Sequence, residues 1–283
     1  MLAELLVGLV LGLVLGWLGY WRGALSAGGL AGVVLISSLT FGAAGWVWGI
    51  LPSILFLSWT LWSRYGAARK AQLTDRFSQS PRHGLLQVLA SVGWAAALAL
   101  LHRAAPTARS VFVAYVGALA TLCADTWASE LGVLSRQPPR LVTTGRRVPA
   151  GTPGAISALG CVAALGGAWL VGLVGLLLAV LSAWLENVPW DRILLWLPLA
   201  GAAGGMVGCL VDSFLGAAAQ GMYYCEQCQK ETEVRLHSCG QMARQVRGWR
   251  WLTNEGINFV SSVVGAAVAA AIVAWLAHTD ISW

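Results

Sequence analysis

The sequence predicts an all-α fold, a polytopic membrane bundle of about eight transmembrane helices. Of its 283 residues, 58% are hydrophobic and only 11% are charged, whereas soluble domains carry about 25% charged residues. The chain contains 16 Trp and 34 Gly, and membrane proteins favour Trp at the interfaces and Gly within their helices. Apolar runs of about 20 residues, long enough to cross a bilayer, recur along the whole chain. We therefore expect a single transmembrane domain, residues 1–283.

Eight apolar runs are the predicted spans. Almost no loop separates the second run from the third, and the sixth is long enough to tilt or break. The predicted number of helices therefore ranges from seven to nine. The gaps between the runs are too short for a soluble domain, and the longest of them, residues 221–253, is predicted to be a loop insert. The runs cover residues 2–21, 23–43, 45–63, 84–102, 110–134, 155–184, 193–220 and 257–277.

The loop charges predict the orientation. With the N-terminus outside, all of the 18 Lys and Arg except Arg103, Arg109 and Arg192 fall in cytoplasmic loops, as the positive-inside rule requires. The C-terminus is then also outside, and the loop insert is cytoplasmic. The formal charge of +6 indicates topology signals and attraction to anionic lipid. A nucleic-acid partner is not expected, because the basic residues are spread over several short loops and form no contiguous patch.

Apart from Glu4 near the N-terminus, three acidic residues lie within the apolar runs. Asp125 and Glu130 are near the cytoplasmic end of the fifth run, and Asp212 is near that of the seventh. An ionised carboxylate in hydrocarbon costs at least a few kcal/mol, so such a residue usually faces a partner, a cavity or an ion. Asp125 and Ser129 are four apart and share a helix face, whereas Glu130 points about 140° away from Asp125. We predict the three acids to be catalytic and Ser129 to bind substrate. Interhelical hydrogen bonding, or pairing with a loop Arg, is the alternative role for the acids.

A Gly-rich motif opens the sixth run from the cytoplasmic side. The sequence VPAGTPGAIS covers residues 148–157. Glycines directly before a helix suit an N-terminus whose free N–H groups and positive dipole end bind an anion. Arginines beside such a turn can meet phosphate charge. An ordinary loop-to-helix turn is the alternative. The predicted phosphate-binding residues of this segment are Arg146, Arg147, Gly151, Thr152 and Gly154.

An asparagine pair opens the eighth run on the same side of the membrane. Asn254 and Asn258 are four apart and share one helix face, although amides at such a place can also cap or join helices. Carboxylate and amide oxygens together suit Mg²⁺, which binds through a few carboxylates and bridges phosphate oxygens. We therefore expect Asp125 and Asp212 to bind Mg²⁺. The expected chemistry is metal-assisted handling of phosphate at the cytoplasmic interface, where the protein mainly positions groups and neutralises charge.

Four motifs at these residues resemble those of a known family. In this order they are similar to the successive motifs of the transmembrane-protein-19 family, which is also catalogued as domain of unknown function 92. The resemblance covers most of the chain from residue 110 onward. Plant members of that family are assigned as phytyl-phosphate kinases. The motifs are ADTWASELG (124–132), VPAGTPGAIS (148–157), GCLVDSFLGAAAQ (208–220) and NEGINFVSS (254–262).

The resemblance implies a membrane-embedded kinase. Its substrate is expected to be an isoprenoid monophosphate of phytyl or polyprenyl type, converted to the diphosphate with a nucleoside triphosphate such as CTP. The expected partners are thus the bilayer, the isoprenoid phosphate and the nucleotide. Asp125 and Asp212 would hold Mg²⁺ and the nucleotide phosphates, with Glu130 as a secondary ligand or base. The Gly-rich motif would hold phosphate, and Asn254 and Asn258 would orient metal or substrate.

Four soft ligands in the loop insert predict a structural zinc site. Cys225, Cys228, His237 and Cys239 form the pattern C-x2-C-x8-H-x-C, which suits tetrahedral Zn²⁺. All four positions would be filled by protein, so the ion would organise the loop and take no part in catalysis. A disulfide is disfavoured in a reducing compartment. Reduced loop thiols without metal are the alternative.

Other functional classes make different demands on the same residues. A transporter or flippase of a phosphorylated lipid would use the acids to couple H⁺ or Na⁺, but the chain shows no clear inverted repeat and its acids lie near one face. A cytidylyl or phosphoalcohol transferase should carry a denser set of acids on one helix. A non-enzymatic scaffold would tolerate Asp125→Asn and Asp212→Asn. The oligomeric state does not follow from the sequence.

Overall fold

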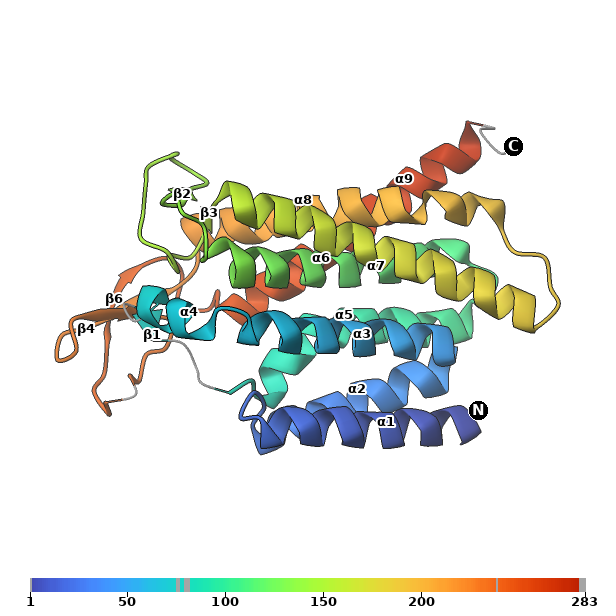
Figure 1. Cartoon of the computed structure of the whole chain (residues 1–283), viewed down its shortest axis with the longest axis horizontal. Helices are drawn as coiled ribbons and strands as arrows, with labels where there is room; N and C mark the ends of the chain where they lie inside the picture. Colours follow the sequence, from blue (N-terminus) through green and yellow to red (C-terminus); the bar gives the residue numbers. More distant parts are fainter. Residues whose placement is uncertain (1, 75–76, 79–81, 238, 280–283) are drawn as a thin grey trace.

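The computed structural model is a bundle of long helices and describes residues 2–74, 77–78, 82–237 and 239–279. Within these residues, eight helices are long and apolar enough to cross a membrane. The first residue of the first helix and the last residue of the eighth lie at the same end of the bundle (Figure 1). The eight are α1 (Leu2–Trp21), α2 (Ala27–Ala44), α3 (Trp46–Arg64), α5 (Leu85–Ala104), α6 (Arg109–Gly132), α7 (Ala158–Leu185), α8 (Leu197–Ala218) and α9 (Asn254–His278).

Each predicted apolar run corresponds to one of these helices, and the differences lie at the ends. The sixth run does not break, because α7 continues for 28 residues. It begins at Ala158, where the Ser157 hydroxyl accepts a hydrogen bond from the Gly160 N–H and caps the helix. α9 begins three residues earlier than predicted, since the Thr253 side chain caps its first turn. A short 3-10 helix, η1 (Arg192–Trp196), leads directly into α8.

The opposite end of the bundle, which we call the loop end (Figure 1), carries the remaining elements, and within the described residues these are a short helix and six short strands. The all-α prediction did not include these strands. They form in polar loop segments that have too few apolar residues for a packed helix. One sheet has the order β1-β5-β4-β6, and β2 pairs with β3. The elements are α4 (Ala67–Thr74), β1 (Phe77–Ser78), β2 (Arg140–Leu141), β3 (Ala155–Ile156), β4 (Met222–Cys225), β5 (Lys230–Thr232) and β6 (Arg244–Arg247).

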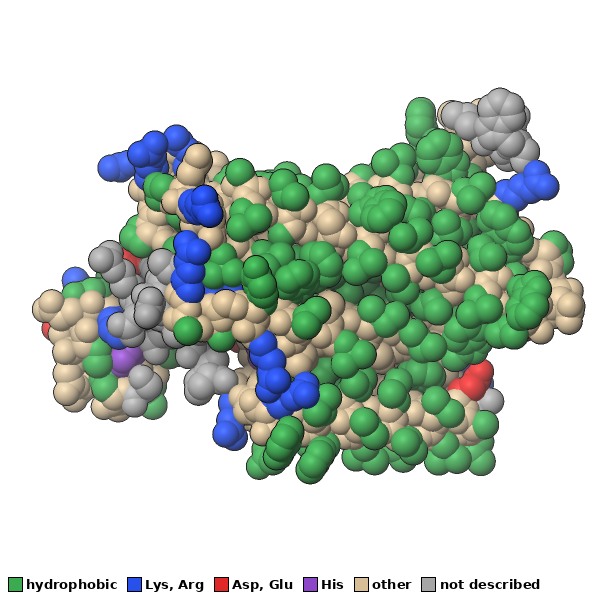
Figure 2. All heavy atoms as spheres, viewed as in Figure 1, with side chains coloured by type: hydrophobic (Ala, Val, Ile, Leu, Met, Phe, Trp, Pro, Cys, Tyr) green, Lys and Arg blue, Asp and Glu red, His purple; other side chains and the backbone are tan. Residues whose placement is uncertain are grey.

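The polar and apolar surfaces divide as a membrane protein requires. Figure 2 shows hydrophobic side chains over the long sides of the bundle and most of the visible Lys and Arg at the loop end. This distribution agrees with the charge pattern that predicts a cytoplasmic loop end. The outside position of both termini stays a prediction, and residues 280–283 lie outside the described part of the chain.

Helix α6 forms the centre of the bundle. It is more buried than any of the other seven spans, and it packs against α3, α5, α7, α8 and α9. Val113, Leu119 and Ala120 on this helix are completely buried. The hydroxyl of Tyr115, also buried, donates a hydrogen bond to the backbone carbonyl of Trp48 on α3. The polar residues of α6 are therefore held within a tightly packed environment.

Small residues allow α6, α8 and α9 to approach each other closely. A Cβ atom added to Gly208 on α8 would lie 2.4 Å from the side chain of Thr121 and 2.9 Å from the carbonyl oxygen of Ser261. A Cβ on Gly205 would lie 2.9 Å from the backbone of Ala120. Neither position has room for a side chain, as is common where membrane helices pack through glycine.

The close packing at Gly208 predicts a position-specific cost. Gly208→Ala should lower the free energy of unfolding by about 1–3 kcal/mol, the usual cost of overpacking. The matched control is Gly93→Ala on α5, where the described residues leave the added Cβ with no heavy atom within 4 Å. Alanine favours helix by up to about 1 kcal/mol over glycine, so this control should be neutral or stabilising. Thermal unfolding in detergent measures both, and equal midpoints would contradict the packing described here.

Candidate functional site

Asp125 and Asp212 lie on neighbouring helices at the same depth. Helices α6 and α8 both run toward the loop end, and Thr121 on α6 contacts Gly208 on α8. Each aspartate follows its contact residue by four positions, one helical turn, so the two carboxyl groups come together just beyond this contact. The charge of Asp125 acts directly on Asp212. Both side chains are partly accessible, so a ligand can reach them.

Helix α9 supplies the third side of this site. The Ser261 hydroxyl donates a hydrogen bond to Oδ2 of Asp212 at 3.1 Å and is also 3.1 Å from the carbonyl oxygen of Asn258. Asn258 lies one turn closer to the loop end than Ser261, and Asn254 is the first residue of α9. Both asparagines are partly accessible. Ser261 was not among the predicted residues, although its spacing of three from Asn258 places it on the same helix face.

Glu130 and Ser129 are not part of this group. The Glu130 carboxylate forms an ion pair with Lys70 of α4 at 2.5 Å. The same ammonium group donates a hydrogen bond to the carbonyl oxygen of Trp62 at 2.6 Å. This pairing favours the alternative role of charge pairing, with a lysine in place of the loop arginine considered, and the role of Glu130 as a metal ligand or base stays a prediction. Ser129 is exposed, and its hydroxyl donates to the carbonyl oxygen of Asp125 at 2.6 Å.

The Gly-rich motif lies beside α8 and before the start of α7. A Cβ on Gly154 would lie 2.4 Å from the carbonyl oxygen of Ser213, the residue after Asp212. Gly151 and Gly154 have φ angles of +87° and +76°, which favour glycine. The prediction that they open the helix directly is corrected, because β3 intervenes and the cap is Ser157. The glycines therefore shape a turn that packs next to the aspartate pair.

The other predicted residues of this segment contribute less directly. The Thr152 hydroxyl donates to the carbonyl oxygen of Pro149 at 2.8 Å, within the turn itself. Arg146 and Arg147 are exposed near the tip of the loop that joins β2 to β3. They can meet a ligand that approaches from the loop side, and they line no buried part of the site.

The loop insert lies at this end of the bundle and adds a third acid to the aspartate pair. Its two ends are held together, since the Gly221 N–H donates to Leu252 and the Trp249 N–H donates to Ala219. Glu233, directly after β5, acts electrostatically on Asp212 and is itself affected by Glu255. Burial raises the pKa of the Glu233 carboxyl group. No sequence signal separates this residue from other loop acids, because only the fold brings it to the site.

Arg247 brings a positive charge to the same region. One terminal nitrogen of its guanidinium group donates to the carbonyl oxygen of Ala217 at 2.8 Å. The other, Nη2, is buried and has no hydrogen-bond partner among the residues that the structure describes. The carboxylates of Glu231 and Glu233 act on this side chain. A partly buried guanidinium group with one unused, buried nitrogen suits the recognition of an oxyanion.

The predicted zinc ligands lie together in the insert. The donor atoms of Cys225, Cys228, His237 and Cys239 all lie within 4.8 Å of one another. The two sulfur atoms of Cys225 and Cys239 are 3.6 Å apart, close to the ~3.8 Å edge of a tetrahedron with Zn–S bonds of about 2.3 Å. A backbone hydrogen bond at Gln241, with a further contribution from His237, lowers the pKa of the Cys239 thiol to about 6. The donor set and its spacing therefore fit a tetrahedral metal site.

We expect the Lys70–Glu130 pair to contribute more to the free energy of unfolding than an exposed ion pair does. Its side chains are only 11% and 22% exposed, whereas those of Arg109 and Asp191 are 58% and 39% exposed. Lys70→Met leaves the shielded Glu130 carboxylate without its lysine partner and should lower the free energy of unfolding by about 3–5 kcal/mol. Arg109→Met should cost less than about 1 kcal/mol.

Thermal unfolding of both variants in detergent provides the test. The double variant Lys70→Met/Glu130→Leu removes both charges and should recover most of the loss. Equal effects of the two single substitutions, or no recovery in the double variant, would contradict a structural role for the pair.

Comparison with known proteins gives relatives over most of the chain. Protein PGR of Arabidopsis thaliana is 31% identical over 248 residues, which cover 83% of this chain and 84% of that protein. An uncharacterised membrane protein of Methanocaldococcus jannaschii is 40% identical over 105 residues, 37% of this chain and 39% of its own. Protein VTE6, chloroplastic, of Arabidopsis thaliana is 26% identical over 255 residues, 87% of this chain and 64% of that protein.

No solved structure matches the chain. The family model described as "Integral membrane protein DUF92" matches residues 10–266. This match covers all but the ends of the chain and agrees with its eight apolar helices. The protein is therefore an integral, multi-pass membrane protein that belongs to the DUF92 family.

Proposed function

We propose that this protein is a membrane-embedded kinase that converts an isoprenoid monophosphate to its diphosphate. The observation that supports it most is the pair Asp125 and Asp212, which repel each other at one depth on two parallel helices. Like charges held together without a neutralising cation are costly. A divalent cation would relieve this cost, and carboxylate oxygens are the ligands that Mg²⁺ prefers. The two aspartates would thus hold Mg²⁺ together with the nucleotide phosphates.

The chain's own residues then have distinct tasks. The bound metal would neutralise charge on the phosphates during transfer. Ser261 fixes the orientation of Asp212 through its hydrogen bond. Arg247 offers its free buried donor to a phosphate oxygen, and the turn at Gly151 and Gly154 lies against α8 where a phosphate could pack closely. Asn258 would orient metal or substrate from α9.

The proposed reaction is an in-line phosphoryl transfer. An oxygen of the isoprenoid monophosphate attacks the terminal phosphorus of the nucleoside triphosphate and forms a new O–P bond. The bond from that phosphorus to the bridging oxygen breaks, and the nucleoside diphosphate leaves with its electron pair. A phosphate dianion needs no general base to attack, and the protein mainly positions the groups. Glu130 has no part in this proposal, because its carboxylate is paired with Lys70.

The substrate class comes from the family. The motifs around Asp125, Asp212 and Asn258 resemble those of plant members assigned as phytyl-phosphate kinases, and this suggests an isoprenoid phosphate and CTP as donor. The site lies at the loop end, which the basic residues of the loops favour as the cytoplasmic side, where nucleotide is present. A transporter of phosphorylated lipid is the competing function, and the test below separates the two.

The activity is tested with purified protein, farnesyl or phytyl phosphate, Mg²⁺ and each nucleoside triphosphate. We expect formation of the isoprenoid diphosphate. Activity should fall by at least about a hundredfold in Asp125→Asn and Asp212→Asn, because electrostatic stabilisation of the transition state usually contributes most to catalysis. Asp191→Asn is the matched control, since this acid pairs with Arg109 at the other end of the bundle. It should retain full activity.

Two results would contradict the kinase. Folded protein that gives no diphosphate with any pair of substrates would remove the proposed reaction. Mg²⁺-independent movement of the phosphorylated lipid across vesicle membranes, abolished by the same aspartate substitutions, would favour the transporter. Product formed at the normal rate by Asp125→Asn would keep the reaction and reject the site.

We further propose that Cys225, Cys228, His237 and Cys239 bind one structural Zn²⁺. The ion would hold the insert in the conformation that presents Glu233 to Asp212. Purified protein should contain about one zinc per chain by elemental analysis. Cys225→Ser should lose the metal and expose residues 221–253 to protease, whereas Cys161→Ser, on α7, should keep both metal and protection. Full protection of a metal-free Cys225→Ser variant would contradict this role.

A further inference from the structure

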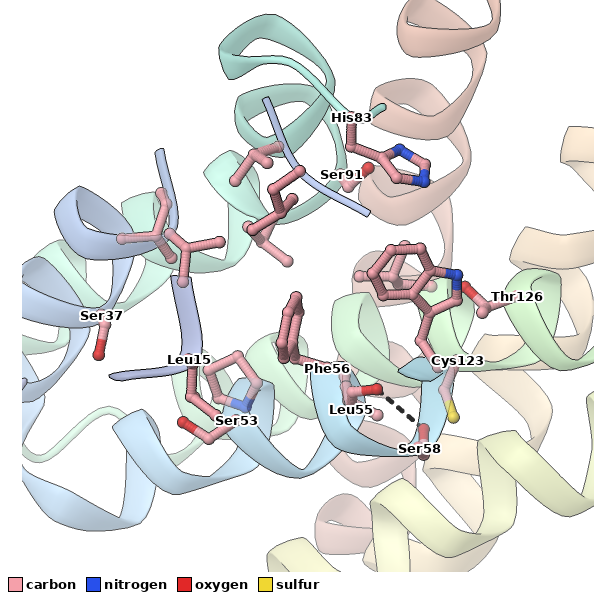
Figure 3. A pocket seen from close by; sticks show the side chains of 18 of the residues that line it. Leu15, Ser37, Ser53, Leu55, Phe56, Ser58, His83, Ser91, Cys123 and Thr126 are labelled. Carbon is pink, nitrogen blue, oxygen red and sulfur yellow. Dashed lines mark hydrogen bonds between the residues drawn. The ribbon is translucent and has the colours of Figure 1, made fainter. Parts of the chain in front are cut away.

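An apolar chamber lies on the other side of α6 from the aspartate pair. It is lined by residues of α1, α2, α3, α5 and α6, and its volume is about 180 Å³. Figure 3 shows Phe56 of α3 between Ser37 of α2 on one side and His83 and Thr126 on the other. The polar wall residues add little polarity, because Ser37, Ser53 and Ser58 donate their hydroxyls to backbone carbonyls. The walls therefore present mostly hydrocarbon and aromatic surface.

The chamber runs from the loop end toward the middle of the bundle. On α3 its lining begins at Trp59, near the loop end, and reaches Gly49. Ten helical residues rise about 15 Å, at 1.5 Å per residue. This is about half of the ~30 Å hydrocarbon core of a bilayer. A single apolar chain that enters at the loop end would thus reach about the middle of the membrane.

The loop end of the chamber borders the proposed phosphate site. Thr126, in its wall, directly follows Asp125 on α6. His83 packs edge-on against Trp59 at this end, with ring centroids 4.9 Å apart. The carboxylates of Glu130 and Glu255 both act on His83, so negative charge lies near this end of the chamber. A head group at the mouth would therefore lie beside the catalytic pair.

Phe41 packs behind the end of the chamber that Gly49 lines. A Cβ added to Gly49 would lie 2.0 Å from the ring of Phe41, so the ring packs flat against the backbone of α3. Phe41 is only 2% exposed and lies one helical turn beyond Ser37, which lines the chamber. The ring therefore lies directly behind the lining residues Ser37 and Gly49. The lining's length of about 15 Å accommodates about a dozen chain carbons, given C–C bonds of about 1.5 Å in a zigzag.

We propose that this chamber binds the isoprenoid tail of the substrate, with the phosphate at its loop-end mouth and Phe41 setting the length that is enclosed. The chemical class of the ligand rests on the proposed function, whereas the place and depth of the site rest on the chamber. A farnesyl tail, with twelve carbons in its main chain, fills the chamber, and longer tails extend beyond it. The four N-terminal spanning helices thereby determine the specificity of a reaction carried out by α6, α8 and α9.

The first test measures binding without catalysis. Full-length protein in detergent is exposed, without nucleotide, to farnesyl phosphate that carries a photoreactive diazirine on its terminal isoprene unit, and labelled peptides are mapped by mass spectrometry. We expect labelling of α2 and α3 around Phe41 and Gly49. Unlabelled farnesyl phosphate should compete, and straight-chain dodecyl phosphate should compete at least about tenfold less well, a difference of 1.4 kcal/mol.

A matched pair of substitutions tests the place of the tail. Ser91→Phe on α5 adds a ring inside the chamber, whereas Leu100→Phe on the same helix enlarges a side chain that is 47% exposed on the outer surface. Ser91→Phe should reduce labelling by about tenfold or more, and Leu100→Phe should leave it unchanged. Labelling confined to outward-facing residues, or equal effects of the two variants, would overturn the proposal.

Substitution of Phe41 tests the proposed limit on the length of the isoprenoid tail. Phe41→Leu removes part of the ring and should shift the preference in competition from farnesyl toward the longer geranylgeranyl phosphate. An unchanged chain-length preference in folded Phe41→Leu would overturn the role of Phe41. Because these readouts need no turnover, chamber labelling in a protein without kinase activity would support this inference and reject only the reaction. Kinase activity with labelling outside the chamber would support the reaction and reject the chamber as the site of the tail.

Discussion

The close approach of the α6, α8 and α9 backbones is the constraint on which the rest of the structure depends. Gly208 and Gly265 have no room for a side chain, and a Cβ on Gly265 would lie 1.9 Å from the Thr121 hydroxyl. In a bilayer, helices gain little from hydrophobic burial against each other, so they associate through tight packing and interhelical hydrogen bonds. The glycines therefore do more than fill space. They bring Asp125 and Asp212 together at one depth and let Ser261 reach the second carboxylate.

The loop end extends this packing into a site that accepts charge. The insert is held at its two ends by backbone hydrogen bonds between residues 219–221 and 249–252, and its sheet carries Glu233 and Arg247 toward the end of α8. The Gly-rich turn reaches α8 from the other direction. Acids, a partly buried guanidinium group and a glycine turn thus converge from distant parts of the chain. Such a mixture suits a metal and phosphates better than an apolar ligand.

The N-terminal helices have a different task from the C-terminal ones. α1 and α2 pack closely through Gly8 and Gly12, and together with α3 and α5 they line an apolar space beside α6. This helix therefore separates two environments, with Thr126 facing the chamber and Asp125 facing α8. One helix can serve both because successive residues differ by about 100° in direction. A head group and its tail can then be held on adjoining faces of the same helix.

The sequence by itself determined the fold class and the apolar spans, and it singled out Asp125, Asp212 and the Cys and His cluster of the insert. These follow from composition, from run length and from residue types that are costly in hydrocarbon or typical of metal sites. Only the tertiary structure decided that Glu130 pairs with Lys70, that Glu233 and Arg247 reach the site, and that a chamber lies beside α6. The physical reason is that these features depend on contacts between segments far apart in the chain. Local sequence patterns specify helices and their ends, but not which loop residue meets which helix.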